Sequence, residues 1–309
     1  MTDCASIVTV GICPSWDVVC TGDDIDWGCH PKVLQSRTVA GKAFNVSRAL
    51  GWMGRSNIAA GLWGEVDFSE MSAVVEPVSD FIDVRFTKAA GRTRDNITVV
   101  DKGGSREMHL RAASNLASIE SLAELEKDLR GMIDSDTVCV FAGSIPGGEL
   151  LDGVISVIES VKKCGAKIVV DTSGEALDEI VDLGGIEILK PNLDELSELL
   201  GVNVEDRPEA IAWTAKTLLD RAKTIVVTRG EKGAVVVTKD KVLQGRCITK
   251  NKNVTTVGCG DYFLAGFLSG VSLEDSLTKG LKAAAARAWS DESDWTEIEN
   301  CVEVHINKF

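Results

Sequence analysis

The chain has 309 residues, of which 44% are hydrophobic and 26% are charged, and this composition is ordinary for a globular protein. Its 47 acidic residues outnumber its 33 basic residues and give a formal net charge of −14, so a surface built to neutralise nucleic-acid phosphates is not expected. No basic region precedes a long apolar run at the N-terminus, and no apolar segment reaches the roughly 18 residues of a membrane span. We therefore expect a cytoplasmic protein with neither nucleic acid nor a membrane as its partner.

The first third of the chain mixes two strand patterns. Residues 6–12 and 56–62 are apolar and typical of core strands, and they flank a helical pattern over 44–54. Four further segments alternate like half-exposed antiparallel strands joined by turns: 17–24, 81–91, 94–104 and 106–112. We expect the latter to form a small sheet, or lid, from insertions at about 14–40 and 80–112.

From residue 135 onward, short β-branched runs alternate with helical patterns. The predicted strands are 136–143, 166–174, 186–192 and 223–230, and the predicted helices are 150–165, 175–184 and 193–201. This alternation indicates a parallel sheet covered by helices on both faces. Residues 224–239 differ, because two β-rich runs joined by a glycine-containing turn predict a hairpin near one sheet edge. With no long linker or repeat, we expect a single α/β domain over residues 1–309.

The nine cysteines do not suggest a disulfide or metal framework. Their number is odd, and no Cys-x-x-Cys pair occurs among Cys4, Cys13, Cys20, Cys29, Cys139, Cys164, Cys247, Cys259 and Cys301. Only three histidines are present, so a closed zinc site has little support. Reduced and mostly buried thiols are the favoured interpretation.

The segment NVTTVGCGDYFLAGFLSG, residues 253–270, combines two glycines, an acid and an apolar helical pattern. In a helix, Phe263, Leu264, Phe267 and Leu268 would share one face, and Gly266 would allow close packing. The amides of Gly258, Cys259 and Gly260 would then lie ahead of the helix as an anion cradle.

Asp261, at the same helix end, would be held ionised and aimed at the occupant of the cradle. Phosphoryl transfer to a hydroxyl fits this arrangement, with Asp261 as general base and the amides stabilising the transferred group. A tight glycine turn with Asp261 as a helix cap explains the pattern equally well.

Several motifs together identify a resemblance. Residues 255–268, TTVGCGDYFLAGFL, resemble the C-terminal signature of the ribokinase-like carbohydrate kinases, the phosphofructokinase B family, with Cys259 in place of an alanine. Residues 40–54, AGKAFNVSRALGWMG, are similar to the N-terminal signature, with Ala40 and Ala43 where glycines are usual. LKPNLDELSELLG (189–201) and VVTRGEKGAVVV (226–237) are similar to the family's Asn-x-x-Glu and nucleotide-side stretches.

Within that family, TRDNITVVD, FAGSIPGG and IVVDTSGEAL are most like the 1-phosphofructokinase and tagatose-6-phosphate kinase branch. The resemblance implies a mostly parallel sheet flanked by helices on both faces, with a small antiparallel β lid. It also implies ATP-dependent phosphorylation of a sugar-phosphate hydroxyl with Mg²⁺, and it leaves a K⁺ requirement open.

On the sugar side, the resemblance implies contacts from Asp17, Gly41, Lys42, Asn45, Arg94 and Ser144. Simpler interpretations exist for several of them: a turn aspartate at Asp17, a solvated charge at Lys42 and a surface charge near Asp95 at Arg94. A guanidinium suits phosphate, and a residue that follows a core strand, as Ser144 does, lies where open α/β folds bind ligands.

On the nucleotide side, the resemblance implies Asn192, Thr228, Gly230 and Gly233, with Glu195 and Asn192 organising Mg²⁺ through water. Asn192 and Glu195 also have the spacing of a capping box, in which each side chain satisfies a backbone amide. Both roles are compatible.

Other functions remain open. The kinase could act on an unphosphorylated sugar or a nucleoside, and Lys42 and Arg94 are the discriminating residues. A sugar or nucleotide sensor without turnover is disfavoured by the intact Asp261 loop, and a dinucleotide-dependent oxidoreductase lacks its Gly-x-Gly-x-x-Gly fingerprint. Exposed edges of the lid strands, with family habit, also suggest a homodimer through the lid.

Overall fold

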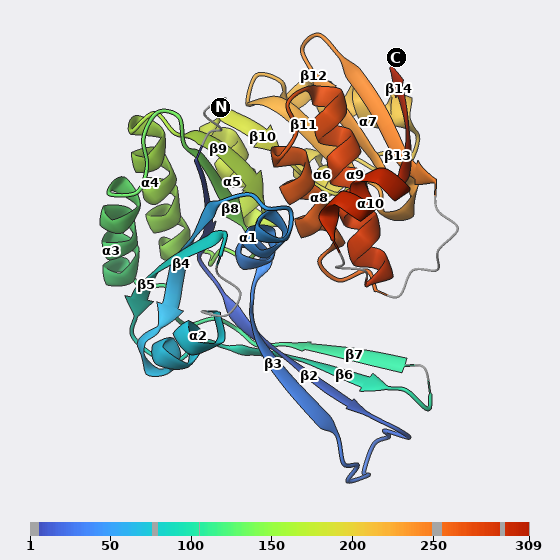
Figure 1. Cartoon of the computed structure of the whole chain (residues 1–309). Coiled ribbons are helices and arrows are strands. Elements are labelled where there is room, and N and C mark those ends of the chain that lie inside the picture. Colours follow the sequence, from blue (N-terminus) through green and yellow to red (C-terminus); the bar gives the residue numbers. More distant parts are fainter. Residues whose placement is uncertain (1–5, 76–79, 105, 249–254, 291–293, 309) are drawn as a thin grey trace.

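The structure, a computed structural model, describes residues 6–75, 80–104, 106–248, 255–290 and 294–308. Two sheets are present in this part of the chain, one of ten strands and one of four. The α/β architecture with a mostly parallel main sheet and a small second sheet is therefore confirmed (Figure 1).

The main sheet has the strand order β14-β13-β12-β11-β10-β9-β8-β1-β4-β5. Neighbours from β11 to β5 are parallel, whereas β12, β13 and β14 are added as antiparallel strands at one edge. The predicted hairpin over 224–239 is confirmed as the β11–β12 pair. The strands are β1 (Ile7–Gly11), β4 (Asn57–Gly64), β5 (Ile82–Ala89), β8 (Val138–Ala142), β9 (Lys167–Asp171), β10 (Ile186–Leu189), β11 (Ala222–Thr228), β12 (Ala234–Thr238), β13 (Val242–Ile248) and β14 (Glu303–Lys308).

Helices cover both faces of the main sheet (Figure 1). Alternate residues of β1 show why: Val8 and Val10 pack in one core cluster and Ile7 in another, because successive side chains point to opposite faces. The first cluster is closed by α3 (Ile119–Arg130), α4 (Glu149–Lys163), α5 (Glu175–Leu183), α6 (Leu193–Leu200) and α7 (Pro208–Ala215). The opposite face is covered by α1 (Lys42–Trp52), α8 (Cys259–Leu268) and α9 (Leu273–Trp289), with α2 (Phe68–Val75) and α10 (Trp295–Cys301) at its periphery.

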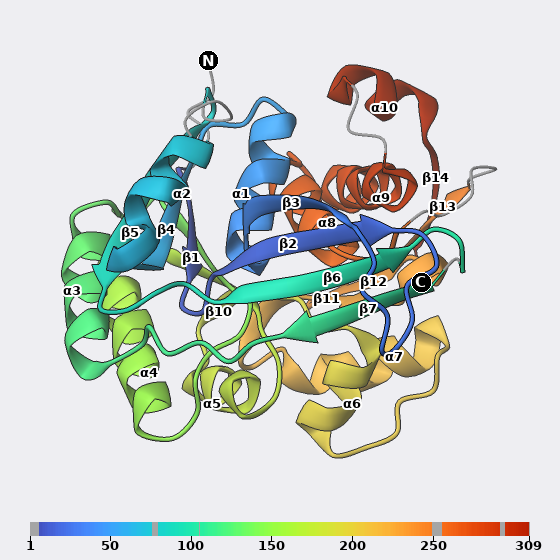
Figure 2. The same ribbon diagram turned by 90° about the horizontal axis from the view of Figure 1, so that it is seen from below.

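The lid is a sheet in the order β3-β2-β6-β7, made of β2 (Ser15–Gly22), β3 (Leu34–Ala40), β6 (Asp95–Asp101) and β7 (Arg106–Arg111). Figure 1 shows these four strands extending away from the main sheet, and Figure 2 shows them side by side in this order. The outer pairs β2–β3 and β6–β7 are antiparallel, as expected, but the central pair β2–β6 is parallel. The reason is that both hairpins leave the main body with their first strand, and these two first strands lie side by side.

One predicted lid segment belongs elsewhere. Residues 81–91 were expected as a lid strand, but β5 pairs in parallel with β4 at the edge of the main sheet. An edge strand of a parallel sheet exposes alternate residues, as Ile82 (buried) and Asp83 (exposed) show. Its pattern is therefore the same as that of a lid strand, and the second lid segment begins after β5 rather than at residue 80.

The cysteine prediction holds only in part. The seven cysteines whose side chains are described are all free thiols, but only Cys139 is fully buried, and Cys29 is exposed. Burial raises the pKa of the Cys139 thiol to about 12, so it stays protonated. Cys4 and the side chain of Cys301 lie outside what the structure describes.

Candidate active site

A cleft of about 730 Å³ lies between the lid and the carboxyl ends of the main-sheet strands. It is lined by every residue that the sequence proposed for the site: Asp17, Gly41, Lys42, Asn45, Arg94, Ser144, Asn192, Glu195, Thr228, Gly230, Gly233, Gly258, Cys259, Gly260 and Asp261. These residues come from the lid and from both halves of the main sheet. Open parallel sheets bind their ligands at this edge.

The glycine loop has the geometry of an anion site. Gly258 is the N-cap of α8 with φ of 81°, a left-handed conformation that favours glycine. The Asp261 and Tyr262 amides bond to the Gly258 carbonyl, whereas the Cys259 and Gly260 amides make no backbone bond to a described residue outside α8. Unpaired amides at a helix N-terminus attract anions. The Cys259 thiol points toward the Thr255 carbonyl, 3.8 Å away, so the cysteine leaves the backbone cradle intact.

The helix itself is more buried than its pattern suggested. Phe263 and Phe267 pack against β12 and β13, while Leu264 packs in the separate cluster beside α1. The expectation of a single apolar face is therefore wrong: residues 261–267 are all buried, because α8 is enclosed between α1, α9 and the sheet. This enclosure fixes the helix N-terminus in place.

Asp261 is a buried carboxylate, 5% exposed, that accepts a hydrogen bond of 2.8 Å from Asn45 Nδ2. Burial and the nearby charge of Asp171 raise the pKa of Asp261 to about 6, against the opposing effects of Asn45, Lys42 and Lys190. The helix end was expected to hold Asp261 ionised, but desolvation is the larger effect. A carboxylate with this pKa is ionised at neutral pH and is a stronger base than an exposed one.

Two residues that the sequence reasoning missed complete the charged centre. Asp171 at the end of β9 is 1% exposed, and the ammonium groups of Lys190 and Lys42 lie 2.9 Å and 3.1 Å from its carboxylate. Burial alone would raise the pKa of Asp171, but the two lysines outweigh it and lower that pKa. Asp171 ends β9 and Lys190 directly follows β10, the neighbouring parallel strand, and this position at the carboxyl edge of the sheet was the available signal.

Lys42 is the first residue of α1 and faces three carboxylates. Asp171 is the main cause of its raised pKa, which burial opposes and Glu195 and Asp261 support. In the preceding loop, Gly41 has a positive φ of 111°, a conformation that favours glycine. Neither Ala40 nor Ala43 has a positive φ. The two alanines at usual glycine positions therefore impose no backbone strain here.

Asn192 and Glu195 form the predicted capping box at the start of α6. Asn192 Oδ1 accepts from the Glu195 amide and Glu195 Oε2 accepts from the Asn192 amide, both at 2.8 Å. Asn192 also forms a parallel bridge with Thr228 at the end of β11. The box thus holds two side-chain oxygens at the cleft wall.

Asp17 lies on the cleft-facing side of lid strand β2. Its carboxylate accepts from Ser15 Oγ at 3.3 Å and from Asn96 Nδ2 at 3.5 Å. The turn that was the alternative explanation for Asp17 is not found, because the residue is inside a strand. Ser144 directly follows β8 and Gly143, at the edge predicted for it.

Arg94 occupies the junction between the lid and the main body. Its guanidinium donates to three backbone carbonyls, those of Pro14 (3.2 Å), Cys13 (2.9 Å) and Ala112 (2.7 Å). These carbonyls belong to the segments that lead into β2 and out of β7. Arg94 therefore ties lid connections together, and the surface ion pair considered for it with Asp95 is not among its described contacts.

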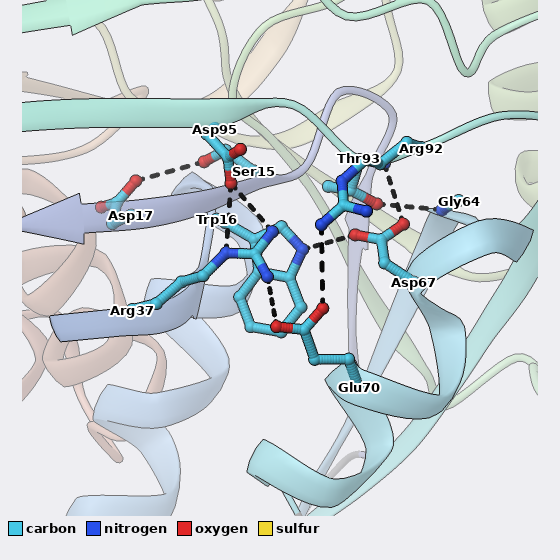
Figure 3. Close-up of polar contacts among 10 residues, drawn as sticks. All are labelled: Ser15, Trp16, Asp17, Arg37, Gly64, Asp67, Glu70, Arg92, Thr93 and Asp95. Carbon is cyan, nitrogen blue, oxygen red and sulfur yellow. Dashed lines mark hydrogen bonds and ion pairs between the residues drawn. The ribbon is translucent and has the colours of Figure 1, made fainter.

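Figure 3 shows a second group of contacts at the base of the lid. The indole N–H of buried Trp16 donates to Asp67, and Asp67 also accepts from the Thr93 amide at 3.0 Å. Arg37 stacks on Trp16 at 4.0 Å and pairs with Asp95 and with Glu70 of α2. These contacts hold Trp16 of β2 and Asp95 of β6 in place, directly before Asp17 and Asn96 in the two strands.

Comparison with known proteins gives a consistent result. A family model described as pfkB family carbohydrate kinase matches residues 5–289. The chain is 28% identical to a 1-phosphofructokinase of Bacillus subtilis, with 93% of each chain covered. It is 30% identical to a tagatose-6-phosphate kinase of Staphylococcus epidermidis, with 91% of this chain and 90% of the relative covered.

Among solved structures, the fold is similar to that of phosphofructokinase-2 from Escherichia coli in complex with fructose-6-phosphate. The TM-score is 0.87 at 24% identity, and the match covers 96% of this chain and 98% of the other.

Proposed function

This chain belongs to the pfkB family of carbohydrate kinases, and we propose that it transfers the γ-phosphoryl group of ATP to a free hydroxyl of a sugar phosphate. Fructose 1-phosphate and tagatose 6-phosphate are the leading substrates, since the relatives are named for such reactions. The observation that carries the proposal is the buried Asp261 carboxylate beside the amides of the glycine loop.

In the proposed reaction, the substrate hydroxyl lies next to Asp261 and attacks the γ-phosphorus. A new oxygen–phosphorus bond forms, the bond from the γ-phosphorus to the bridging oxygen of ADP breaks, and the hydroxyl proton moves to Asp261. The amides of Cys259 and Gly260, in the first turn of α8, stabilise negative charge on the transferred group. Asn45 holds the Asp261 carboxylate through its 2.8 Å hydrogen bond.

The two substrates would occupy opposite ends of the cleft. The end of the cleft next to the lid would hold the sugar, and it is lined by Asp17, Lys42, Asn45 and Ser144. Thr228, Gly230, Gly233 and Asn192 lie toward the nucleotide. The apolar side chains of Val257, Phe263 and Leu281 also line the cleft and suit a nucleobase.

Mg²⁺ fits the oxygen donors present at the nucleotide end. Glu195 uses one carboxylate oxygen in the capping box and has its other oxygen free of a described hydrogen bond. Asn192 and Glu195 would therefore hold the ion through water, as magnesium prefers. The ion would neutralise phosphate charge on ATP. A K⁺ requirement is tested by replacing K⁺ with Na⁺ at constant ionic strength.

The proposal places the protein in the cytoplasm. ATP is the second substrate, and the seven described cysteines carry free thiols, which suit a reducing compartment. None of the helices in the described ranges has the length and apolar character that crossing a membrane requires.

A homodimer through the lid is part of the proposal. The residues that alternate with Asn96 and Arg111 along the lid strands are apolar: Met108 and Leu110 are 42% and 50% exposed, and they pair across the ladder with Val99 and Ile97. An apolar sheet face with two free edges is suited to pairing with a second copy. Sedimentation should show a dimer at assay concentrations, and Met108→Glu, which lies outside the cleft lining, should shift it toward monomer. A wild-type monomer at those concentrations contradicts this part.

An ADP-release assay tests the function, with each sugar run beside its phosphate ester. We expect turnover with at least one ketohexose phosphate and a much higher kcat/KM than with the parent sugar. A preference for a neutral sugar or a nucleoside would change the proposed substrate, but the protein would still be assigned as a kinase. No ADP release with any acceptor would favour the sensor.

A further inference from the structure

We propose that Arg111, on lid strand β7, binds the phosphate that the substrate keeps throughout the reaction. This inference rests on the proposed function and names one determinant of its specificity. It moves the expected phosphate contact away from Arg94, because three of the five N–H groups of Arg94 donate to backbone carbonyls.

Four cationic side chains line the cleft in the part of the chain that the structure describes. Lys42, Lys190, Arg94 and Arg111 are the lysines and arginines among its described lining residues. Both lysines pair with Asp171, and the Arg94 guanidinium donates to three carbonyls. Within the described chain, Arg111 has neither a hydrogen bond nor an ion pair from its side chain. Among these four cations, it is therefore the one whose donors are all available to a ligand, whereas Arg94 has three of its five N–H groups engaged.

The strand register places Arg111 beside the other polar groups of the lid. Asp17 pairs with Asn96 in the β2–β6 ladder, and Asn96 pairs with Arg111 in the β6–β7 ladder. Residues directly opposite each other in adjacent strands point to the same face. Asp17, Asn96 and Arg111 therefore form a row across the cleft-facing side, and all three line the cleft.

Asn96 provides an independent sign that this row binds a ligand. Its amide nitrogen donates to Ser15 Oγ at 2.9 Å, but its Oδ1 is inaccessible to solvent and has no hydrogen-bond partner. Buried polar atoms without partners are uncommon and call for an explanation. A rotation of the Asn96 amide would be needed to bring this oxygen to a substrate hydroxyl between Asp17 and Arg111.

Electrostatics make a free guanidinium useful at this position. A protein of net charge −14 repels an anionic sugar at long range, so binding requires a local positive group inside the cleft. A guanidinium can donate two parallel hydrogen bonds to a phosphate. Asp17 would contact hydroxyls of the same sugar, which gives the lid row both a charge and a hydroxyl contact.

The experiment compares Arg111→Ala with Lys102→Ala, a control that removes the same charge from the same hairpin outside the cleft. KM is measured for the phosphate ester that the wild type accepts, for its parent sugar and for ATP. For Arg111→Ala we expect a roughly ten- to hundredfold higher KM for the ester, with the KM values for ATP and the parent sugar nearly unchanged. Arg111→Lys keeps the charge but not the fork, and it should recover part of the loss.

Several outcomes would overturn the inference. If Arg111→Ala and Lys102→Ala give the same ester KM, Arg111 does not bind the phosphate. If Arg94→Ala raises the ester KM selectively in a folded protein and Arg111→Ala does not, the contact belongs to Arg94. If Arg111→Ala does not fold, Arg111→Lys, which keeps the positive charge, is compared with Arg111→Gln, which removes it. Equal KM values for the ester in these two folded variants would show that the charge at residue 111 does not bind the phosphate. Wild-type activity limited to unphosphorylated acceptors would instead refute the proposed function.

Discussion

Asn45 Nδ2 donates a hydrogen bond of 2.8 Å to Asp261, although the two residues are 216 positions apart in the chain. Asn45 lies in the first turn of α1 and Asp261 in the first turn of α8, and these two helices pack against each other beside the sheet. The contact joins the N-terminal and C-terminal motifs at the proposed reaction centre. The first predictions therefore concern the role of Asp261 as a base and its protonation.

Asp261→Asn should lower kcat by roughly 10²–10⁴-fold, because the general base is lost. The matched control is Asp194→Asn, which removes a charge from the exposed first turn of α6 outside the cleft. ATP binding should persist, and the Tm at pH 8 should not fall, because a neutral amide costs less to bury than a carboxylate. Steady-state kinetics and thermal unfolding measure both. Near-normal turnover in the folded variant would rule out Asp261 as the general base.

The pH dependence of kcat/KM should follow the raised pKa of Asp261, about 6. A general base must be deprotonated, so kcat/KM should be constant above this value and fall as the pH decreases through it. Folding stability has the corresponding sign. Because the folded pKa exceeds the usual value of 3.8, the native state binds more protons between the two values, and this contribution to stability decreases as pH rises through that window. A profile with its acid limb near pH 4 would contradict a buried base.

Glu195→Gln separates the metal role of the capping box from its structural role. Glutamine can still accept from the Asn192 amide, so the free energy of unfolding should change little. The Mg²⁺ concentration for half-maximal rate should rise several-fold, whereas Glu198→Gln on the exposed side of α6 should have no effect. Glu195→Ala should in addition lose about 1 kcal/mol of stability. If the Mg²⁺ dependence of Glu195→Gln is unchanged, Glu195 has only the structural role of capping α6.

Asp67→Ala tests the base of the lid. The variant leaves the indole N–H of Trp16 and the amide of Thr93 without their acceptor, at a cost of about 1–3 kcal/mol for each buried donor. Because Trp16 precedes Asp17 in β2, the sugar KM should rise while the ATP KM stays the same. Glu65→Ala, an exposed acid in the short helix η1 (Glu65–Asp67), is the control. Equal changes in both KM values would argue against a lid-specific effect.

Gly266→Ala should destabilise the protein by about 1–3 kcal/mol or more through overpacking. A Cβ there would lie 2.4 Å from the Lys279 carbonyl oxygen of α9, and neither backbone can move freely. At Gly153 in α4 the clash, 2.8 Å, is with the flexible end of Leu122, so Gly153→Ala should cost less. Chemical denaturation of the two variants provides the comparison. Equal stabilities would show that α8 and α9 can separate.

The main-sheet strands and most site residues could be predicted because their signals are local. Apolar runs next to helical patterns identified β1, β8, β9, β10 and β11, and the glycine–aspartate loop marked the start of α8. The error at β5 has a physical cause, since an edge strand and a lid strand expose alternate residues in the same way. The error at α8 has another, because neighbouring elements can bury every side of a helix whose pattern suggests only one buried face.

The sequence by itself determined which chemical groups are present and in what order: a glycine loop followed by an acid, a capping box and a lysine that opens a helix. These features depend on neighbours along the chain, where spacing alone decides what can interact. Only the tertiary structure decided which groups face one another. Asp171 pairs with Lys42 and Lys190, Arg94 turns to backbone carbonyls while Arg111 keeps its charge free, and burial raises the pKa of Asp261 to about 6. Desolvation and charge pairing depend on what the folded chain packs around a group, and residues distant in sequence supply those surroundings.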